Sequence, residues 1–313
     1  MSVLLVIVNA LVPIAFVILL GVLAGKTGLI NPKSSGALAA LTLDFCLPAL
    51  LFTATATMST KELQNWRFFL GIALGLLVIY LLALAISLAL FRKPIAASSL
   101  QALNSAFPNM AFMGVPLLTA VIGASAVLSV VVGNLISSFV LLPLTLTLLE
   151  AGSPTQKGKN VSVVVWRSIL NAVKQPLVWA PLAGIIMAVT HIPLPIVGQK
   201  SFSLIGEATS GVALFAMGLL LSGQKLRIGA AAALNVVFKI LVQPAAMWFL
   251  AIVFGVTGVY RREMILLGAL PTASMTAMFA VEYKVYTDES DATILLSTVV
   301  SIATLGVVIA LTR

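Results

Sequence analysis

Long hydrophobic runs separated by short polar segments make up most of the chain. A helix needs about 20 apolar residues to cross the hydrocarbon core of a membrane. Measured against this length, the pattern predicts ten spanning helices. We expect them at residues 3–24, 36–57, 67–91, 97–122, 127–149, 168–189, 197–222, 229–254, 263–285 and 292–312. The expected fold class is therefore an all-α membrane protein with ten transmembrane helices.

The longest polar stretch between the expected spans runs from residue 151 to residue 167. It is rich in Gly, Ser, Pro, Lys and Asn, which is typical of a flexible linker. It divides the chain into residues 1–150 and 168–313, each with five of the expected spans. We interpret these parts as a first five-helix repeat, a linker and a second five-helix repeat.

Similar residues recur in the two halves at a constant offset of 163 residues, the difference between positions 108 and 271. The pairs at this offset are Pro13 and Pro176, Asp44 and Glu207, Phe52 and Phe215, Pro108 and Pro271, Asn134 and Ser297, and Ser138 and Ser301. Because each repeat has an odd number of spans, the second must lie upside down relative to the first. Inverted repeats with interrupted helices at corresponding positions are typical of secondary transporters.

Two of the expected spans contain a proline with polar neighbours, Pro108 in residues 104–116 and Pro271 in residues 268–276. Proline has no N–H, and its ring clashes with the carbonyl four residues earlier, so each helix should open there. Such a polar interruption at membrane depth is tolerated only where protein or a water-filled cavity covers it. The alternative is that each proline only kinks its helix.

Each interruption would leave a half-helix N-terminus with unpaired N–H groups and a partial positive charge. Two such ends that meet near the middle of the membrane would suit a carboxylate. We therefore predict a substrate site at the crossing of the two interrupted helices. The candidate substrate-binding residues are Asn104, Ser105, Pro108, Asn109, Pro271, Thr272 and Ser274.

Three ionisable residues, Asp44, Glu207 and Lys239, lie deep in expected spans. A charge is costly in lipid, so we expect these side chains to face the bundle interior or water. Lys239 shares a helix face with Asn235 and Gln243, each four residues away. We interpret the three charges as candidates for ion coupling or charge balance, with a purely structural ion pair as the alternative.

Smaller polar faces occur on the fifth and tenth expected spans. Asn134 and Ser138 lie four residues apart on one, and Ser297 and Ser301 lie four apart on the other. These four residues are candidates for lining the transport pathway. The alternative is hydrogen bonding between helices, which contributes about 0.6 kcal/mol per pair on average.

The composition also indicates an integral membrane protein, because 61% of the residues are hydrophobic and only 9% are charged. The excess of Lys and Arg, 18 against 9 Asp and Glu, is read as an orientation signal and not as nucleic-acid binding. More of these loop cations fall on the side of the linker than on the side of the termini. We expect a multi-pass protein of the cell (inner) membrane with a cytoplasmic linker and both termini outside.

The chain offers few groups for catalysis or metal binding. One cysteine and one histidine argue against a Cys/His zinc site, and no Gly-x-x-x-x-Gly-Lys-Ser/Thr phosphate loop is present. We therefore expect no enzyme activity, no metal and no cofactor, with H⁺ or Na⁺ as candidate coupling ions. The expected partners are a small organic anion and the lipid bilayer, and a homodimer is an open alternative.

Five stretches of the chain resemble the auxin efflux carrier family of membrane transporters, and in particular its bacterial members named malonate transporters. These stretches are residues 43–52, 107–117, 176–184, 210–218 and 268–271. The resemblance implies ten helices in two inverted repeats, with helices 4 and 9 crossing at their prolines, as in bile-acid:sodium symporters. It also implies organic-anion substrates. Pro108 and Asn109 match the Asn-Pro-Asn sequence of plant members, and Phe107 stands where the first Asn would be.

The sequence-based hypothesis is a secondary active transporter that moves a small organic anion, such as malonate or a similar carboxylate, by alternating access. The main alternative is a sodium-coupled symporter of an amphipathic or neutral solute. A channel and a membrane-embedded enzyme are the remaining alternatives.

Overall fold

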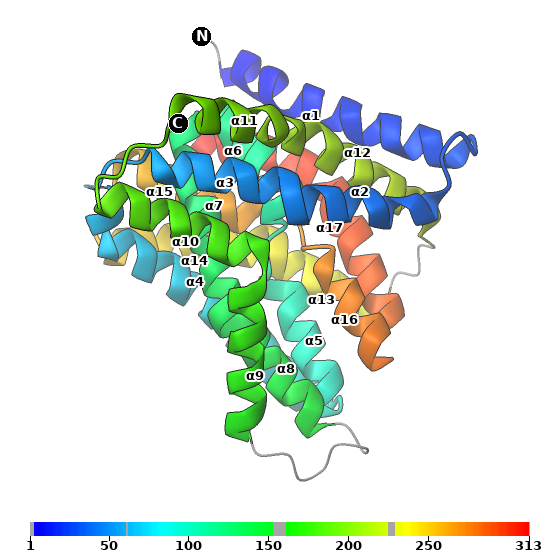
Figure 1. Ribbon diagram of the computed structural model, residues 1–313. Coiled ribbons are helices and arrows are strands. Elements are labelled where there is room, and N and C mark those ends of the chain that lie inside the picture. The colour runs from blue at the N-terminus through cyan, green and yellow to red at the C-terminus, as the bar shows by residue number, and fades with distance from the viewer. Residues whose placement is uncertain (1–2, 61, 153–160, 225–228, 313) are drawn as a thin grey trace.

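The computed structural model describes residues 3–60, 62–152, 161–224 and 229–312. Within these ranges the chain is helical and forms no β-strand, and seven helices are long and apolar enough to cross a membrane, or eight if one bent pair counts as a span. Several helices run side by side across the molecule and others run at a steep angle to them, and both termini lie at the same end of the molecule (Figure 1). The protein is thus an all-helical, multi-pass membrane protein.

The helices are α1 (Val3–Lys26), α2 (Ser35–Leu41), α3 (Leu47–Ala56), α4 (Trp66–Ala89), α5 (Ile95–Ala106), α6 (Val115–Val121), α7 (Val127–Ile136), α8 (Leu142–Ala151), α9 (Val161–Lys174), α10 (Pro176–Val189), α11 (Ile196–Gly206), α12 (Ala208–Gly223), α13 (Ala230–Val237), α14 (Gln243–Val253), α15 (Gly258–Ala269), α16 (Met275–Tyr283) and α17 (Thr287–Leu311). Single π-helical turns join several of them: η2 (Thr42–Cys46), η4 (Met110–Gly114), η6 (Ser137–Leu141) and η8 (Phe238–Val242). Short 3₁₀ turns, η1 (Pro32–Ser34), η3 (Glu62–Gln64) and η5 (Ala124–Ala126), complete the described elements.

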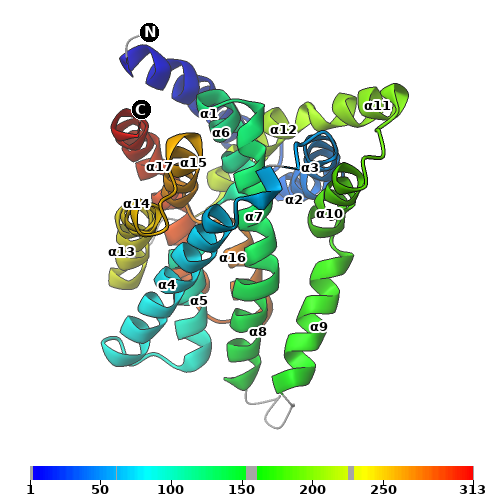
Figure 2. The same cartoon turned by 90° about the vertical axis from the view of Figure 1, so that its left-hand side faces the viewer.

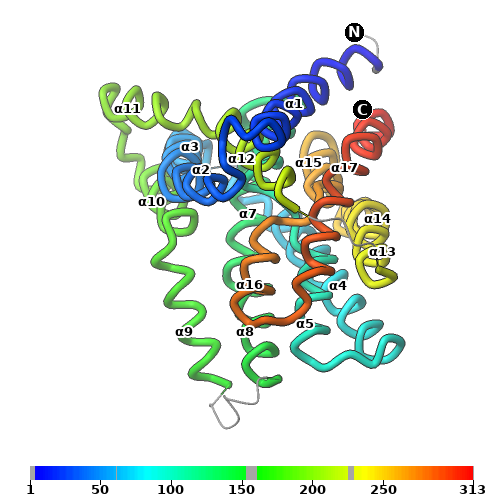
Figure 3. The backbone as a smooth tube through the Cα atoms, turned by 90° about the vertical axis from the view of Figure 1, so that its right-hand side faces the viewer, coloured from blue at the N-terminus to red at the C-terminus, as the bar shows by residue number. Residues whose placement is uncertain are grey.

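Two of the expected spans are interrupted at their prolines. The first consists of α5, an extended segment around Pro108, η4 and α6, and the second consists of α15, a segment around Pro271 and α16. Figure 3 follows the backbone from α15 through this second interruption into α16. The prediction that both helices open at these prolines is confirmed, and neither is a simple kink.

The expected sixth span differs from its prediction. It begins earlier, at Val161, and bends by 66° between α9 and α10. The bend follows from Pro176, which has no N–H to donate, and from the extended conformation of Gln175 before it. Residues 161–167 of the expected linker therefore belong to α9, and its residues 153–160 lie outside the described residues. α9 packs alongside α8 (Figure 2).

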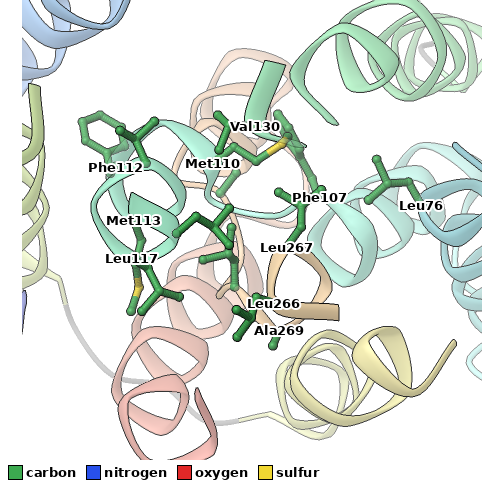
Figure 4. Packing of buried hydrophobic residues seen from close by; sticks show 14 of the residues in the cluster. Leu76, Phe107, Met110, Phe112, Met113, Leu117, Val130, Leu266, Leu267 and Ala269 are labelled. Carbon is green, nitrogen blue, oxygen red and sulfur yellow. The ribbon is translucent and has the colours of Figure 1, made fainter. Parts of the chain in front are cut away.

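The hydrophobic core lies around the first interrupted helix. Phe107, Met110, Met113 and Leu117 point into a cluster with Leu266 and Leu267 of α15, Val130 of α7 and Leu76 of α4 (Figure 4). These side chains are almost completely buried. The interruptions are therefore covered by protein, as their unpaired backbone groups require.

Close backbone contact joins α1 to α12 through two glycines. A Cβ atom at Gly218 would lie 2.0 Å from the carbonyl oxygen of Ile18, and one at Gly21 would lie 2.2 Å from that of Phe215. Only glycine lets the two backbones approach this closely, which is a common device between membrane helices.

Gly218→Ala should therefore lower the thermal unfolding temperature of the detergent-purified protein. The new methyl group meets backbone that cannot rotate away, so we expect a loss of about 1–3 kcal/mol. Gly211→Ala on the same helix is the matched control, because nothing lies within 4 Å of its added Cβ. The control should be neutral or stabilising by up to about 1 kcal/mol. Equal unfolding temperatures for the two variants would contradict the close contact.

Candidate substrate site at the crossing of the interrupted helices

The two interruptions are hydrogen-bonded to each other through their backbones. The N–H of Asn109 donates to the carbonyl of Pro271 at 2.8 Å, and the N–H of Ala273 donates to the carbonyl of Phe107 at 3.0 Å. Pro108 and Thr272 form an isolated antiparallel bridge between these bonds. Each interruption thus satisfies backbone groups that the other helix lost, which stabilises the crossing in the absence of water.

Buried side chains fix the crossing from one side. The Thr272 hydroxyl donates to the carbonyl oxygen of Asn104 at 2.8 Å, and the Thr276 hydroxyl donates to Asn104 Oδ1 at 2.9 Å. Asn104 Nδ2 donates to Ser290 Oγ at 2.9 Å, and the Thr272 N–H donates to Ser297 Oγ at 3.1 Å. All five residues are at most 1% exposed. Asn104, Pro271 and Thr272 therefore build the crossing but do not line the cavity described below.

Ser105 belongs to a second buried hydrogen-bond network. Its hydroxyl donates to Asn235 Oδ1 at 3.1 Å, and Asn235 Nδ2 donates to Tyr286 Oη at 3.1 Å and Thr293 Oγ1 at 3.0 Å. These contacts join α5 to α13 and α17. Like Asn104, Ser105 positions the interrupted helix and has no contact with the cavity.

On its other side the crossing forms one wall of a cavity of about 770 Å³. Of the predicted substrate-binding residues, Pro108, Asn109 and Ser274 line this cavity. Asn109 is the N-cap of η4, where its side chain accepts the N–H of Phe112 at 3.3 Å. Its Nδ2 is left with one weak contact, 3.7 Å from Met217 Sδ. In the described part of the chain, Ser274 Oγ has no hydrogen-bond partner.

Both half-helix N-termini also reach the cavity. The first N–H groups of a helix have no intrahelical partner and carry the positive end of its dipole. Ala111 in the first turn of η4 and Met275 in the first turn of α16 both line the cavity. Two helix N-termini and the residues Asn109 and Ser274 therefore meet at one place on the cavity wall, where the Ser274 Oγ atom is itself buried.

The remaining cavity wall is mostly apolar. Its apolar lining residues include Leu43, Phe107, Met110, Phe112, Leu177, Met217, Leu220, Met275, Met278 and Val281. Methionine side chains are flexible and adapt to ligands of different shape. Polar residues return at the far end, where Lys33, Gln224, Glu282 and Asp291 line the cavity. These come from the α1–α2 connection, the end of α12, the end of α16 and the start of α17, so the cavity opens away from the chain termini.

Lys239 lies at the C-terminal ends of the two half-helices that precede the interruptions, α5 and α15. Its Nζ donates to the carbonyl oxygen of Gly268 at 2.9 Å and to Gln243 Oε1, and Gln243 Nε2 donates to the carbonyl oxygen of Ala106 at 2.8 Å. Gly268 and Ala106 lie at the C-terminal ends of α15 and α5, where carbonyls lack partners and the dipole is negative. Asn235, Lys239 and Gln243 are fully buried, which confirms that this polar stripe points inward.

Asp44 and Glu207, which we expected to face the bundle interior or water, are both exposed and are not buried inside the bundle. No ion pair joins either of them to Lys239 among the described residues. Asp44 lies in the π turn η2 and Glu207 at the junction of α11 and α12. A hydropathy run locates a charge along the span but does not give its face.

Of the four predicted pathway residues, one lines the cavity and three do not. Asn134 lines the cavity and donates to the carbonyl of Leu177 at 2.9 Å. Ser297 contacts the crossing through Thr272 but lies outside the cavity. Ser138 and Ser301 are buried and line no cavity, and the Ser301 hydroxyl donates to the carbonyl of Thr298 in its own helix.

Sequence reasoning did not select the residues at the far end of the cavity, which include Gln224 and Asp291. Gln224 Nε2 donates to Asp291 Oδ1 at 3.4 Å, and its Oε1 has no partner in the described chain. Both residues lie at span ends, where polar residues are ordinary. No local signal distinguishes them from loop residues that simply face water.

A helical membrane chain with a large cavity at two crossed, interrupted helices has the architecture of a membrane transport protein. Residues 6–309 match the family model described as "Membrane transport protein", and the chain belongs to that family. It is 28% identical over 296 residues to "Uncharacterized transporter YfdV" of Escherichia coli, which covers 93% of this chain and 92% of the relative. It is 29% identical over 264 residues to "Putative malonate transporter" of Rhizobium meliloti, covering 82% and 81%.

Plant relatives match over a shorter region. "Auxin efflux carrier component 5" of Arabidopsis thaliana is 32% identical over 209 residues, covering 56% of this chain and 59% of the relative. These matches confirm the resemblance to the auxin efflux carrier family with a bacterial malonate-transporter-like member. The protein is a transporter and not an enzyme.

Proposed function

We propose that the protein is a secondary active transporter that moves a small organic anion by alternating access. The observation that carries this proposal is the convergence of two half-helix N-termini, Asn109 Nδ2 and Ser274 Oγ on one cavity wall. All of these groups can donate a hydrogen bond to a carboxylate, and both helix dipoles favour its negative charge. The matching form of the two interruptions supports ten helices in two inverted repeats.

The cavity favours a carboxylate that carries an apolar body. The donors gather at the crossing, whereas the adjoining wall consists of Met, Phe, Leu and Val side chains. Malonate, named in one relative, has a second carboxylate that would lie against this apolar wall without hydrogen-bond partners, and burying such a charge is costly. We therefore place an amphipathic monocarboxylate ahead of malonate as the substrate.

The position of the Lys239 side chain is an argument for transport that does not require sodium. Partly negative helix C-termini inside a membrane protein can be neutralised by a bound cation, as in other transporters with broken helices. Here the Lys239 side chain already occupies this position and donates to the Gly268 carbonyl and, through Gln243, reaches the Ala106 carbonyl. A sodium-coupled symporter remains the alternative function.

The proposed topology follows the distribution of basic residues. The central segment would be cytoplasmic and both termini outside in the inner membrane, so the described cavity would open to the cytoplasm. A homodimer is compatible with this arrangement. Accessibility of tags at the termini and in residues 153–160 would test the orientation.

A ligand panel on the purified protein tests the substrate class. Octanoate and phenylacetate should raise the thermal unfolding temperature more than acetate or malonate at equal concentration. Binding at 100 times the dissociation constant would stabilise the protein by about 2.7 kcal/mol. Octanol and phenylethanol are matched controls, because they keep the apolar body and lack the carboxylate. A larger shift with malonate would contradict the apolar-body assignment, and no shift with any acid would contradict the anion proposal.

A further inference from the structure

One buried carboxylate plays no part in the site described above. Glu263, in α15, is only 1% exposed, and its Oε2 has no hydrogen-bond partner in the described part of the chain. It forms no ion pair there either, although Arg261 and Arg262 precede it directly. α15 is the half-helix that leads into the crossing at Pro271.

The surroundings of Glu263 contain no described cation that neutralises it. Glu62 in η3 is close enough for its own negative charge to act on Glu263, and the Glu263 charge in turn acts on Tyr260. The ionisable residues on described elements packed against α15 are Arg67 and Tyr80 on α4, Lys239 on η8, and Asp288, Glu289 and Asp291 on α17.

None of these neighbouring groups is placed to compensate the carboxylate. Arg67 is exposed and lies over the ring of Trp66. Tyr80 accepts a hydrogen bond from Thr145, and Lys239 is bonded to Gly268 and Gln243. Asp288, Glu289 and Asp291 are themselves acidic, and they lie in the first turns of α17, far from its C-terminal end. α14, α7 and α6 also pack on α15 and carry no ionisable residue.

Glu263 lies on the closed side of the transporter. The cavity opens among the α1–α2 connection, the end of α12 and the start of α17. Glu263 lies in the first half of α15, and the connection from α14 that leads into this half is on the side of the chain termini. Pro271 lies eight positions further along the chain, which is roughly 12 Å along a helix. Glu263 is therefore part of the layer that seals the cavity from the terminal side.

An ionised carboxylate in this layer would cost several kcal/mol, because the residue is only 1% exposed and its Oε2 has no hydrogen-bond partner among the described residues. A proton removes the charge and most of that cost. We propose that Glu263 is a proton-binding site that must be occupied for the layer on the terminal side to close. When the layer opens, water reaches Glu263, and the carboxylate can ionise.

The sign of the resulting pH dependence follows directly. Lower pH on the terminal side should favour the state in which that side is closed and the cavity is open on the other side. A single titrating group changes such an equilibrium by at most about tenfold per pH unit. This inference rests on the alternating access of the proposed function, but it does not depend on the identity of the substrate.

Glu263→Gln tests the proposal, because glutamine is a neutral group of nearly the same shape. Glu207→Gln is the matched control, since Glu207 is an exposed carboxylate within a span. Infrared difference spectra between acid and alkaline pH should show the carbonyl band of a protonated carboxylic acid in the wild type and in Glu207→Gln. The band should be lost in Glu263→Gln.

A second measurement follows the conformation. In a Cys46→Ala background, Met278→Cys places a thiol on the cavity wall, at a residue that is 65% exposed. The rate at which an impermeant maleimide labels this thiol is measured with and without the additional change Glu263→Gln. The ratio of the rate with Glu263 to the rate with glutamine should rise as pH falls. A ratio that is independent of pH, or a carbonyl band that persists in Glu263→Gln, would overturn the proposal. Neither readout needs a ligand, so failure of the ligand panel would leave this test intact.

Discussion

Replacing Asn109 with aspartate is expected to abolish carboxylate binding and transport while the protein still folds. Aspartate keeps the side-chain oxygen that caps η4 at the N–H of Phe112, and its charge suits a helix N-terminus. It also removes the Nδ2 donor and places a negative charge on the cavity wall, where it would repel a carboxylate. We expect affinity to fall by more than the tenfold to hundredfold that follows from losing a hydrogen bond to a charged group, about 1.5–3 kcal/mol.

Asn109→Ala loses both the cap and the binding group, so it must be compared with a variant that loses only a cap. It should also abolish uptake, and it should cost about 1 kcal/mol of stability for the lost cap. Asn65 offers a closely matched control, since it caps α4 by accepting the N–H of Phe68 at 3.3 Å. Asn65→Ala should show a similar loss of stability with normal uptake. Wild-type uptake or ligand stabilisation by Asn109→Asp would contradict the site assignment.

Lys239→Met is expected to have the second large effect, on both stability and transport. The change keeps much of the side-chain volume but leaves the carbonyl of Gly268 and the amide oxygen of Gln243 without their donor. Each buried group left unsatisfied costs about 1–3 kcal/mol. We therefore expect a large fall in the thermal unfolding temperature and loss of uptake in proteoliposomes. Lys200→Met replaces an exposed lysine on α11 and should change neither property.

The same variant decides between sodium-independent and sodium-coupled transport. Wild-type stability and uptake should be equal in NaCl and KCl at the same ionic strength, because Lys239 occupies the cation position. In Lys239→Met the freed carbonyls can accept a cation, so Na⁺ should restore part of the lost stability. A wild-type unfolding temperature or uptake rate that rises specifically with Na⁺ would contradict this assignment and favour the sodium-coupled alternative.

The hydrophobic pattern alone predicted the class of protein and the places where its helices open. Pro108 and Pro271 remove backbone donors whatever surrounds them, and such a loss inside a membrane must be compensated nearby. The inward stripe of Asn235, Lys239 and Gln243 was also predictable, because helical periodicity places residues four apart on one face. These properties are local, so the order of the residues determines them.

Only the tertiary structure decided which polar groups contact the cavity and which hold the crossing together. Asn104 and Asn109 are five residues apart beside the same proline, yet Asn104 bonds to α16 and α17 while Asn109 lines the cavity. Asp44 and Glu207 lie in hydrophobic runs of the sequence, but only the folded chain shows that both are exposed. Glu263 lies among charged residues at a span end, and its burial depends on elements far away in the chain. The sequence determined where backbone hydrogen bonds fail, and the packing of distant helices determined which groups replace them.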